Sequence, residues 1–546
     1  MNLRIASWAL RGASRVVLVA VLGGLLVTTV RPETAAASTS AVPSRFVAVG
    51  PARLADTRNP AAGGFTRLDG STIRGQVTGR HGFPADATAA ALTVTATDAR
   101  SAGFVTVYPA GSARQLTANV TFNGPGEIVA NGALVALGAG GAVDIYVTGG
   151  PGIVVDVSGA FLPAPGGATA GRFQPISGGA RRVLDTREQG GVLGPAGTRR
   201  VARPDFVPAD AMAVVVNIAI DQSGGAGFVT AWPAGAAKPA TSVLNTERSM
   251  QTRSAMSIIP VTSAGFDVYS MSGGHIIVDV AGYFTGGSAG SSSDGLFVAV
   301  DPNRILDTRG PSPLGNGVQL QAGWTVEVPV TVSGSALVYN LTTVDALRPG
   351  YTTAYPAGNE RSATANVNAI GPGTAIANLA VTALSTRGVA LFSMGGEHLV
   401  ADMTGYFTGR PLGAPKPAPV NVDPRPAAPA GCETESLARL NALRAAHGVG
   451  ALVDDPAALD FACTWSAQMT TTNFKHSTQS QRAGAVGCPS GENIAYASVP
   501  TDLFDMWVAS PGHFENMVSP SYTRAAIGYV TKGGIRYGTM VLVIGC

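Results

Sequence analysis

Several side chains whose types and spacing could do chemistry recur three times along the chain. Asp-Thr-Arg stands at 56–58, 185–187 and 307–309, and an aromatic residue precedes Pro-Ala-Gly in each repeat. Charged groups beside an aromatic ring could bind a sugar or an ion. A repeated Asp-x-Arg is more often a partly buried ion pair, and an aromatic at a strand end is more often a core residue, so we favour structural roles. The residues concerned are Asp56, Arg58, Tyr108, Asp185, Arg187, Trp232, Asp307, Arg309 and Tyr355.

The N-terminus predicts export. Arg4, Arg11 and Arg15 precede an apolar run over 16–30, and small residues follow at 35–37. This pattern is typical of a secretory signal peptide over 1–37, with cleavage after Ala37. The apolar run is shorter than the roughly 20 residues that span a bilayer, and an uncleaved anchor is the alternative. We expect no transmembrane span after cleavage and an extracellular or cell-surface location.

The four cysteines agree with export, because an even number in an exported domain implies disulfides. They are Cys432, Cys463, Cys488 and Cys546, all near the C-terminus. Three pairings are possible, and we favour Cys463–Cys488 with Cys432–Cys546, which would join the two ends of one domain. No pair has CxxC spacing, which argues against a thiolate zinc site.

Three copies of one module precede the cysteines, with a period of about 123 residues. Short β-branched runs such as 91–97 and 143–147 are separated by Gly, Pro, Ser or Asn. These features predict three tandem all-β modules, each an antiparallel sandwich or barrel, over 44–163, 172–285 and 295–408. Each is long enough to bury its own core. Gly- and Ser-rich residues at 163–167 and 286–293 indicate flexible joints, and 409–431 is a proline-rich linker.

Helical periodicity begins after this linker. We expect helices from about Glu433 to His447, from Pro456 with Asp455 as N-cap, and from near Thr501. The chain ends in strand-like segments at 527–531 and 539–544. The region 432–546 is therefore predicted to be an α+β domain.

Four segments of this region carry a family resemblance. They are 440–452 (LNALRAAHGVGAL), 474–477 (FKHS), 491–495 (GENIA) and 506–517 (MWVASPGHFENM). In order and spacing they resemble bacterial CAP domains, also called SCP domains, of the cysteine-rich secretory, antigen 5 and pathogenesis-related 1 superfamily. The three β-rich repeats resemble those of secreted actinomycete proteins.

The resemblance implies an α-β-α sandwich with a cleft in which His476 and Glu492 face each other, joined by His513. Two imidazoles and a carboxylate could bind Zn²⁺ or another divalent metal, or do acid–base chemistry as candidate catalytic residues. The chain has Ser510 where animal and plant relatives carry a second glutamate, and its final strand lacks their aromatic and glutamine residues. Glu492 could instead support a turn, with His476 as its structural partner.

Three functions stay open. The motifs favour a CAP domain that binds a lipid, a cell-wall glycan or a metal, with the β modules as stalk or adhesive units. The first alternative is a hydrolase acting on peptides or cell-wall polymers; we expect no dyad of Ser477 with His476, because neighbouring side chains on extended backbone point apart. The second is a structural adhesion protein. A net charge of +3 and the lack of a basic cluster give no support for nucleic acid binding.

Overall fold

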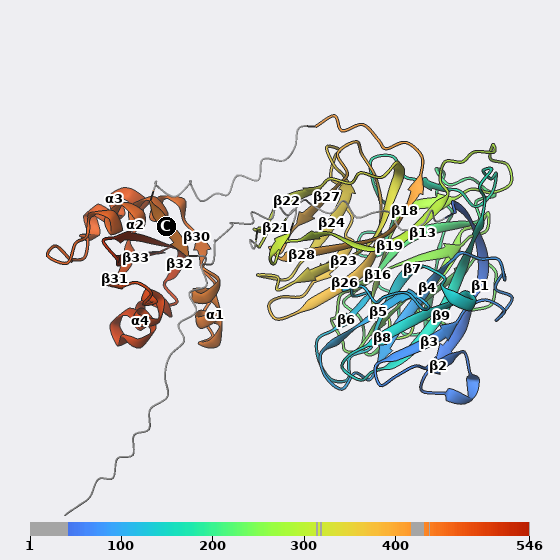
Figure 1. Ribbon diagram of the computed structural model, residues 1–546, viewed down its shortest axis with the longest axis horizontal. Coiled ribbons are helices and arrows are strands. Elements are labelled where there is room, and N and C mark those ends of the chain that lie inside the picture. Colours follow the sequence, from blue (N-terminus) through green and yellow to red (C-terminus); the bar gives the residue numbers. More distant parts are fainter. Residues whose placement is uncertain (1–41, 313–314, 317–318, 417–430, 436, 545–546) are drawn as a thin grey trace, which may run out of the picture. The chain divides into compact units, whose positions relative to one another are not determined.

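The computed structural model describes residues 42–312, 315–316, 319–416, 431–435 and 437–544 (Figure 1). The predicted signal peptide, residues 417–430 of the linker and Cys546 lie outside these residues. The chain divides into two compact units, with almost all of the three repeats in the first and the C-terminal residues in the second.

Each repeat is an antiparallel β-sandwich with the same order of strands in its inner sheet. The inner sheet runs β1-β9-β4-β7 in the first copy, β10-β18-β13-β16 in the second, where β11 also pairs with β18, and β19-β28-β23-β26 in the third. These strands are β1 (Ser44–Asp56), β4 (Ala89–Thr97), β7 (Val129–Ala136), β9 (Gly152–Pro163), β10 (Phe173–Pro175), β11 (Arg181–Asp185), β13 (Ala213–Asp221), β16 (Arg253–Pro260), β18 (His275–Phe284), β19 (Phe297–Asp307), β23 (Gly334–Val344), β26 (Ala375–Ala383) and β28 (His398–Thr408).

The outer sheets also repeat. They run β2-β3-β8-β5-β6, β12-β17-β14-β15 and β22-β27-β24-β25. Their strands, with the small pair β20 and β21, are β2 (Phe65–Arg67), β3 (Thr72–Gln76), β5 (Gly103–Pro109), β6 (Val120–Phe122), β8 (Ala142–Val147), β12 (Gly197–Val201), β14 (Gly227–Pro233), β15 (Leu244–Thr246), β17 (Phe266–Ser270), β20 (Pro311–Ser312), β21 (Gly315–Asn316), β22 (Thr325–Val328), β24 (Gly350–Pro356), β25 (Val367–Ala369) and β27 (Val389–Ser393). The predicted all-β fold of the repeats is confirmed.

The central strands of the inner sheets are buried on both faces. In β4 every residue is buried. Leu92 and Val94 belong to the core between the two sheets of the first copy. Ala89 and Ala91 point the other way, into a core that residues of all three copies share. The copies therefore have cores of their own and in addition pack against one another.

Six phenylalanines, two from each copy, form the centre of this shared core, and we call them the phenylalanine ring set. Each copy pairs with the next through closely spaced rings. The three pairs are Phe46 with Phe284 at 4.2 Å, Phe173 with Phe407 at 4.4 Å and Phe297 with Phe161 at 4.6 Å between ring centroids. Copy 1 thus contacts copy 2, copy 2 contacts copy 3, and copy 3 contacts copy 1, which closes the arrangement.

Three glycines make room for these rings. A Cβ atom on Gly159 would lie 2.1 Å from the ring of Phe46, and one on Gly282 would lie 2.3 Å from the ring of Phe173. Gly405 stands in the same relation to a ring of the third copy. Because real Cβ atoms do not approach carbon so closely, each ring lies directly on the backbone of the neighbouring strand.

The connections between copies are held in place, contrary to the expected flexible joints. Ala168 of the first connection pairs with Ser292 of the second as an isolated β-bridge. Arg172 is buried and donates to the carbonyl oxygens of Gly290 at 2.8 Å and Asp294 at 3.1 Å. Glycine and serine composition predicts flexibility only where no side chain binds the exposed backbone, and here Arg172 does.

The C-terminal unit is an α+β domain, as predicted. Its sheet runs β29-β32-β33-β31, and β30 pairs in parallel with β32. The elements are β29 (Cys432–Glu435), α1 (Ala438–Ala446), β30 (Val453–Asp454), α2 (Pro456–Gln468), α3 (Gln479–Val486), β31 (Ser490–Ser498), α4 (Leu503–Ala509), α5 (Pro511–Met517), β32 (Tyr522–Lys532) and β33 (Ile535–Ile544).

Local signals explain most of these helices. The Asp455 side chain accepts from the backbone N–H of Ala458, as expected of the N-cap of α2. The first helix starts later than predicted, because residues 432–435 form β29. Helix α3 was not predicted, although Thr478 and Gln481 form a capping box at its start.

Both favoured disulfide pairings are wrong, because Cys432 is bonded to Cys463. The cause is the sheet: Cys432 begins β29, which pairs with β32, and α2 packs against β32. This places Cys463 of α2 over the edge strand, with the two Cα atoms 5.7 Å apart. Cys488 is also disulfide-bonded.

Candidate functional site

His476 and Glu492 form the centre of the candidate site in the C-terminal unit. Glu492 lies on β31, and His476 lies in the segment before α3. Nδ1 of His476 is 2.8 Å from Oε1 of Glu492. The His476 side chain is 55% exposed, whereas that of Glu492 is 1% exposed. A buried carboxylate therefore holds an imidazole that solvent can reach.

Glu492 has further partners that the sequence analysis did not predict. Ser477 donates to Glu492 twice, from its backbone N–H to Oε1 at 3.0 Å and from its hydroxyl to Oε2 at 2.6 Å. Arg482 of α3 lies 3.6 Å from Oε1 and donates to the Ser477 hydroxyl at 2.8 Å. The capping box at the start of α3 was the sequence signal for these partners, because it fixes the turn from which the Arg482 side chain reaches back to Ser477. Both oxygens of the buried carboxylate are thus satisfied.

This network selects one tautomer of the neutral ring. An ionised carboxylate only accepts hydrogen bonds, so Nδ1 of His476 carries a proton. In the neutral imidazole, Nε2 then has a free lone pair. Since Glu492 is buried and the ring is half exposed, Nε2 is the atom of this pair suited to a metal ion or a hydrogen-bond donor from outside.

His513 lies on α5. Along the chain, α5 follows β31, whereas the loop that carries His476 precedes β31. Asn493 is buried on β31 and donates to the His513 carbonyl oxygen at 2.9 Å. It also accepts from the side chain of Asn516 at 2.9 Å. Burial, with a smaller effect from the nearby His476, lowers the pKa of His513. A lowered pKa keeps this imidazole neutral at physiological pH, as a metal ligand must be.

The three predicted site residues are brought together only in part. His476 and Glu492 are hydrogen-bonded, and His513 is close enough to His476 for their charges to interact. Among the residues that the structure describes, no three His, Cys, Asp or Glu side chains are grouped to hold one metal ion. Glu492 lies within a strand, and through the backbone N–H of Ser477 it also supports the turn before α3.

The C-terminal unit also matches a known family. The model of the CAP family, the cysteine-rich secretory protein family, matches residues 437–545. Residues 437–545 are a CAP domain. The match includes His476, Glu492 and His513, and a long β-rich region precedes it. No curated protein matches the chain.

Solved structures give weaker likenesses. The N-terminal tandem CBM22 domains of Paenibacillus barcinonensis Xyn10C share 11% identity, with a TM-score of 0.12, 46% of this chain covered and 100% of that one. A triple jelly roll protein of an archaeal virus shares 9% identity, with a TM-score of 0.13 and coverage of 64% and 85%. Scores this low support no argument about fold or function.

The recurring aspartates and arginines of the repeats form ion pairs. In each copy the arginine of Asp-Thr-Arg binds the aspartate of the motif through two nitrogens, as Arg58 does to Asp56 at 2.9 and 2.7 Å. A further arginine, three residues before the aspartate of the motif, binds a buried aspartate on the neighbouring strand, as Arg53 does to Asp156 at 2.9 Å. Burial raises the pKa of Asp156, an effect that its arginine opposes. The same pairs recur as Arg187–Asp185, Arg309–Asp307, Arg182–Asp279 and Arg304–Asp402.

These ion pairs also join the copies. Arg53 of the first copy donates to the carbonyl oxygen of Ala240 in the second, at 3.2 Å. Arg304 of the third donates to the carbonyl oxygen of Leu116 in the first, at 2.7 Å. The recurring aromatics are buried, and Trp232 donates to the Ala236 carbonyl oxygen at 2.9 Å. The motifs singled out in the sequence therefore have structural partners.

No helix among the described residues is long and apolar enough to cross a membrane.

Proposed function

We propose that the protein is exported and that its CAP domain is a binding module whose ligand site includes His476 and His513. One observation carries the proposal: Glu492 is buried with both oxygens satisfied and orients a half-exposed imidazole. A buried carboxylate that fixes the tautomer of an exposed histidine is the usual arrangement behind a histidine that binds a metal or a polar ligand. Export is supported by the N-terminal pattern and by the Cys432–Cys463 bond.

The two histidines are suited to act as ligands of a divalent metal such as Zn²⁺, whereas the Glu492 carboxylate is not. Both oxygens of Glu492 accept hydrogen bonds from His476 and Ser477, so this residue orients the site and does not coordinate. His476 through Nε2 and the neutral His513 would hold the metal, which leaves positions for water or a ligand.

Zn²⁺ titration of the full chain by calorimetry tests this proposal. We expect binding that His476→Ala abolishes and that Glu492→Gln weakens tenfold or more, because the ring loses its orienting carboxylate. His81→Asn, which changes an exposed histidine of the first copy, is the control and should bind as the wild type does. Fatty acids and soluble cell-wall glycans are titrated in the same way. Failure of all three ligand classes, or equal binding by His476→Ala, contradicts the proposal.

The hydrolase alternative gains no support from Ser477. Its side chain is buried and donates to Glu492 while it accepts from Arg482. A nucleophilic serine needs a base that takes its proton, and this hydroxyl proton is already directed to a carboxylate that His476 and Arg482 also approach. We expected the side chains of Ser477 and His476 to point apart. Instead, both side chains contact the same carboxylate, that of Glu492.

A further inference from the structure

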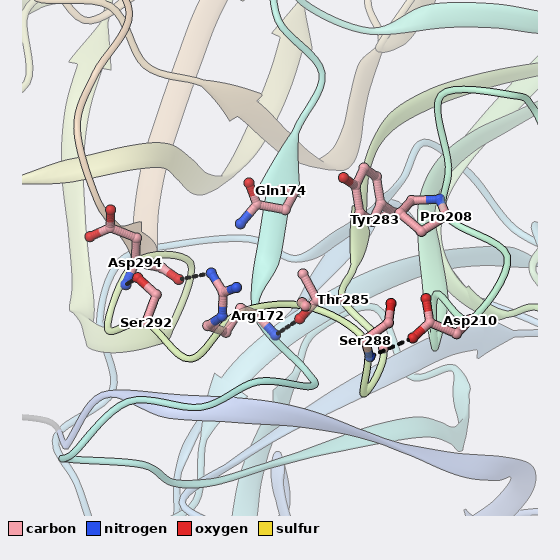
Figure 2. Close-up of a pocket in the computed structure, with 11 residues that line it drawn as sticks. Arg172, Gln174, Pro208, Asp210, Tyr283, Thr285, Ser288, Ser292 and Asp294 are labelled. Carbon is pink, nitrogen blue, oxygen red and sulfur yellow. Dashed lines mark hydrogen bonds between the residues drawn. The ribbon is translucent and has the colours of Figure 1, made fainter.

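The second repeat contains a cavity of about 380 Å³ that no residue of its Asp-Thr-Arg motif lines. We call it the copy-2 pocket. It is lined by β10, the loop before β13, the end of β18 and the segment that leads to copy 3. Figure 2 shows Arg172 between Asp294 on one side and Asp210 on the other, with Gln174 and Tyr283 above it.

The walls of the copy-2 pocket are held in place by hydrogen bonds. Arg172 fixes the segment that ends at Asp294 through the two backbone carbonyl contacts described above. At the other end, the backbone N–H of Ser288 donates to Oδ2 of Asp210 at 2.8 Å. Thr285 accepts from the backbone N–H of Arg172 at 3.0 Å. A site built this way needs little ordering when a ligand binds, which favours affinity.

The repeats themselves show that the fold does not require the glutamine of this lining. Gln174 pairs across the sheet with Tyr283. At the equivalent place the first copy pairs Val47 with Ala160, and the third pairs Val298 with Tyr406. Two copies therefore build the same strand pair with valine where the second has glutamine. The fold therefore does not need Gln174, which occurs in the copy that has the cavity.

The chemistry of the lining selects a ligand class. The lining carries two carboxylates, those of Asp210 and Asp294, and one guanidinium, that of Arg172, which already binds carbonyl oxygens, so an anion would meet net repulsion. Sugar hydroxyls both donate and accept: they can donate to the carboxylates and accept from the Gln174 amide. The ring of Tyr283 offers the apolar surface on which a sugar ring packs. Burial raises the pKa of Tyr283, so its phenol stays a donor.

We propose that the copy-2 pocket binds an uncharged sugar residue of a glycan. The proposal concerns the repeat unit and is independent of the function proposed for the CAP domain. It gives the second copy a role in recognition that the ion pairs of the repeats do not provide.

The test uses the full chain and a panel of neutral oligosaccharides of glucose, galactose, mannose and N-acetylglucosamine, with saturation-transfer NMR and titration. We expect at least one member to bind, and Gln174→Val and Asp294→Asn each to lower its affinity tenfold or more. Gln174→Val installs the residue found in the other two copies, so its melting temperature should match the wild type. Tyr406→Ala, at the position in copy 3 that matches Tyr283, is the control and should bind normally.

Four outcomes overturn the proposal. One is that no sugar of the panel binds, and another is that Gln174→Val binds as tightly as the wild type. The third is that sugar binding is lost in His476→Ala but kept in Gln174→Val, which would assign the binding to the CAP domain. An anionic oligosaccharide that binds more tightly than its neutral counterpart would contradict the charge argument.

Discussion

Truncating one member of the phenylalanine ring set should destabilise all three repeats together. Phe284 is fully buried and packs against rings from both other copies, those of Phe46 and Phe407 among them. Burying roughly 200 Å² of aromatic surface at about 25 cal/mol per Å² corresponds to about 5 kcal/mol. Measured Phe→Ala changes in cores cost about 3–5 kcal/mol. We therefore expect Phe284→Ala to lower the free energy of unfolding of the repeat unit by about 4 kcal/mol.

Hydrogen exchange followed by mass spectrometry distinguishes a shared core from three independent ones, because it reports each copy separately. Protection should fall in β9 of the first copy and β28 of the third as well as in β18, which carries the substitution. Phe228→Ala is the matched control, since Phe228 is partly exposed in the outer sheet of the same copy and should lose far less. Loss of protection confined to the second copy would refute the reasoning.

Two further predictions concern covalent and ionic contacts. Replacing both Cys432 and Cys463 by alanine opens a loop of 31 residues and should cost the CAP domain about 3.5 kcal/mol, measured as a lower denaturant midpoint; an unchanged midpoint would contradict the pairing. Hydrogen bonds from Arg309, helped by its charge and that of Arg304, lower the pKa of Asp307 from 3.8 to about 2. The folded value is depressed, so the stabilisation is present above pH 3.8 and is lost as the pH falls through about 2. Asp307→Asn should be less stable than the wild type at pH 7, and denaturation curves should show the difference vanish near pH 2; a constant difference would contradict this.

The sequence predicted the repeats better than it predicted their packing. Alternating β-branched residues and regularly spaced turns establish a sandwich, because both are local properties of the chain. The shared core depends on residues such as Phe46 and Phe284, which look like ordinary core residues of a single module. Only their contact across copies, over more than two hundred residues, distinguishes the two roles, and no local pattern encodes it.

The CAP domain shows the same division between local and long-range information. The capping aspartate of α2 and the last two strands were predicted correctly, since each has a local signal. The disulfide pairing was predicted wrongly, because the contact of α2 with β32 that decides it is formed far apart in sequence. His476 and Glu492 were named from the family resemblance, and their contact follows from β31, a strand that the sequence analysis did not predict.

The closed contacts of the phenylalanine ring set limit how such a protein can evolve. An open array of repeats can gain or lose a unit at little cost, because each unit contacts only its neighbours. Here the first copy also contacts the third through Phe161 and Phe297, so removing one copy would expose the rings of both others. The six phenylalanines already form three pairs between copies, so a fourth copy would have no partner in the set. These contacts favour three repeats, whereas a position outside the ring set can vary, as Gln174 of β10 does from Val47 and Val298.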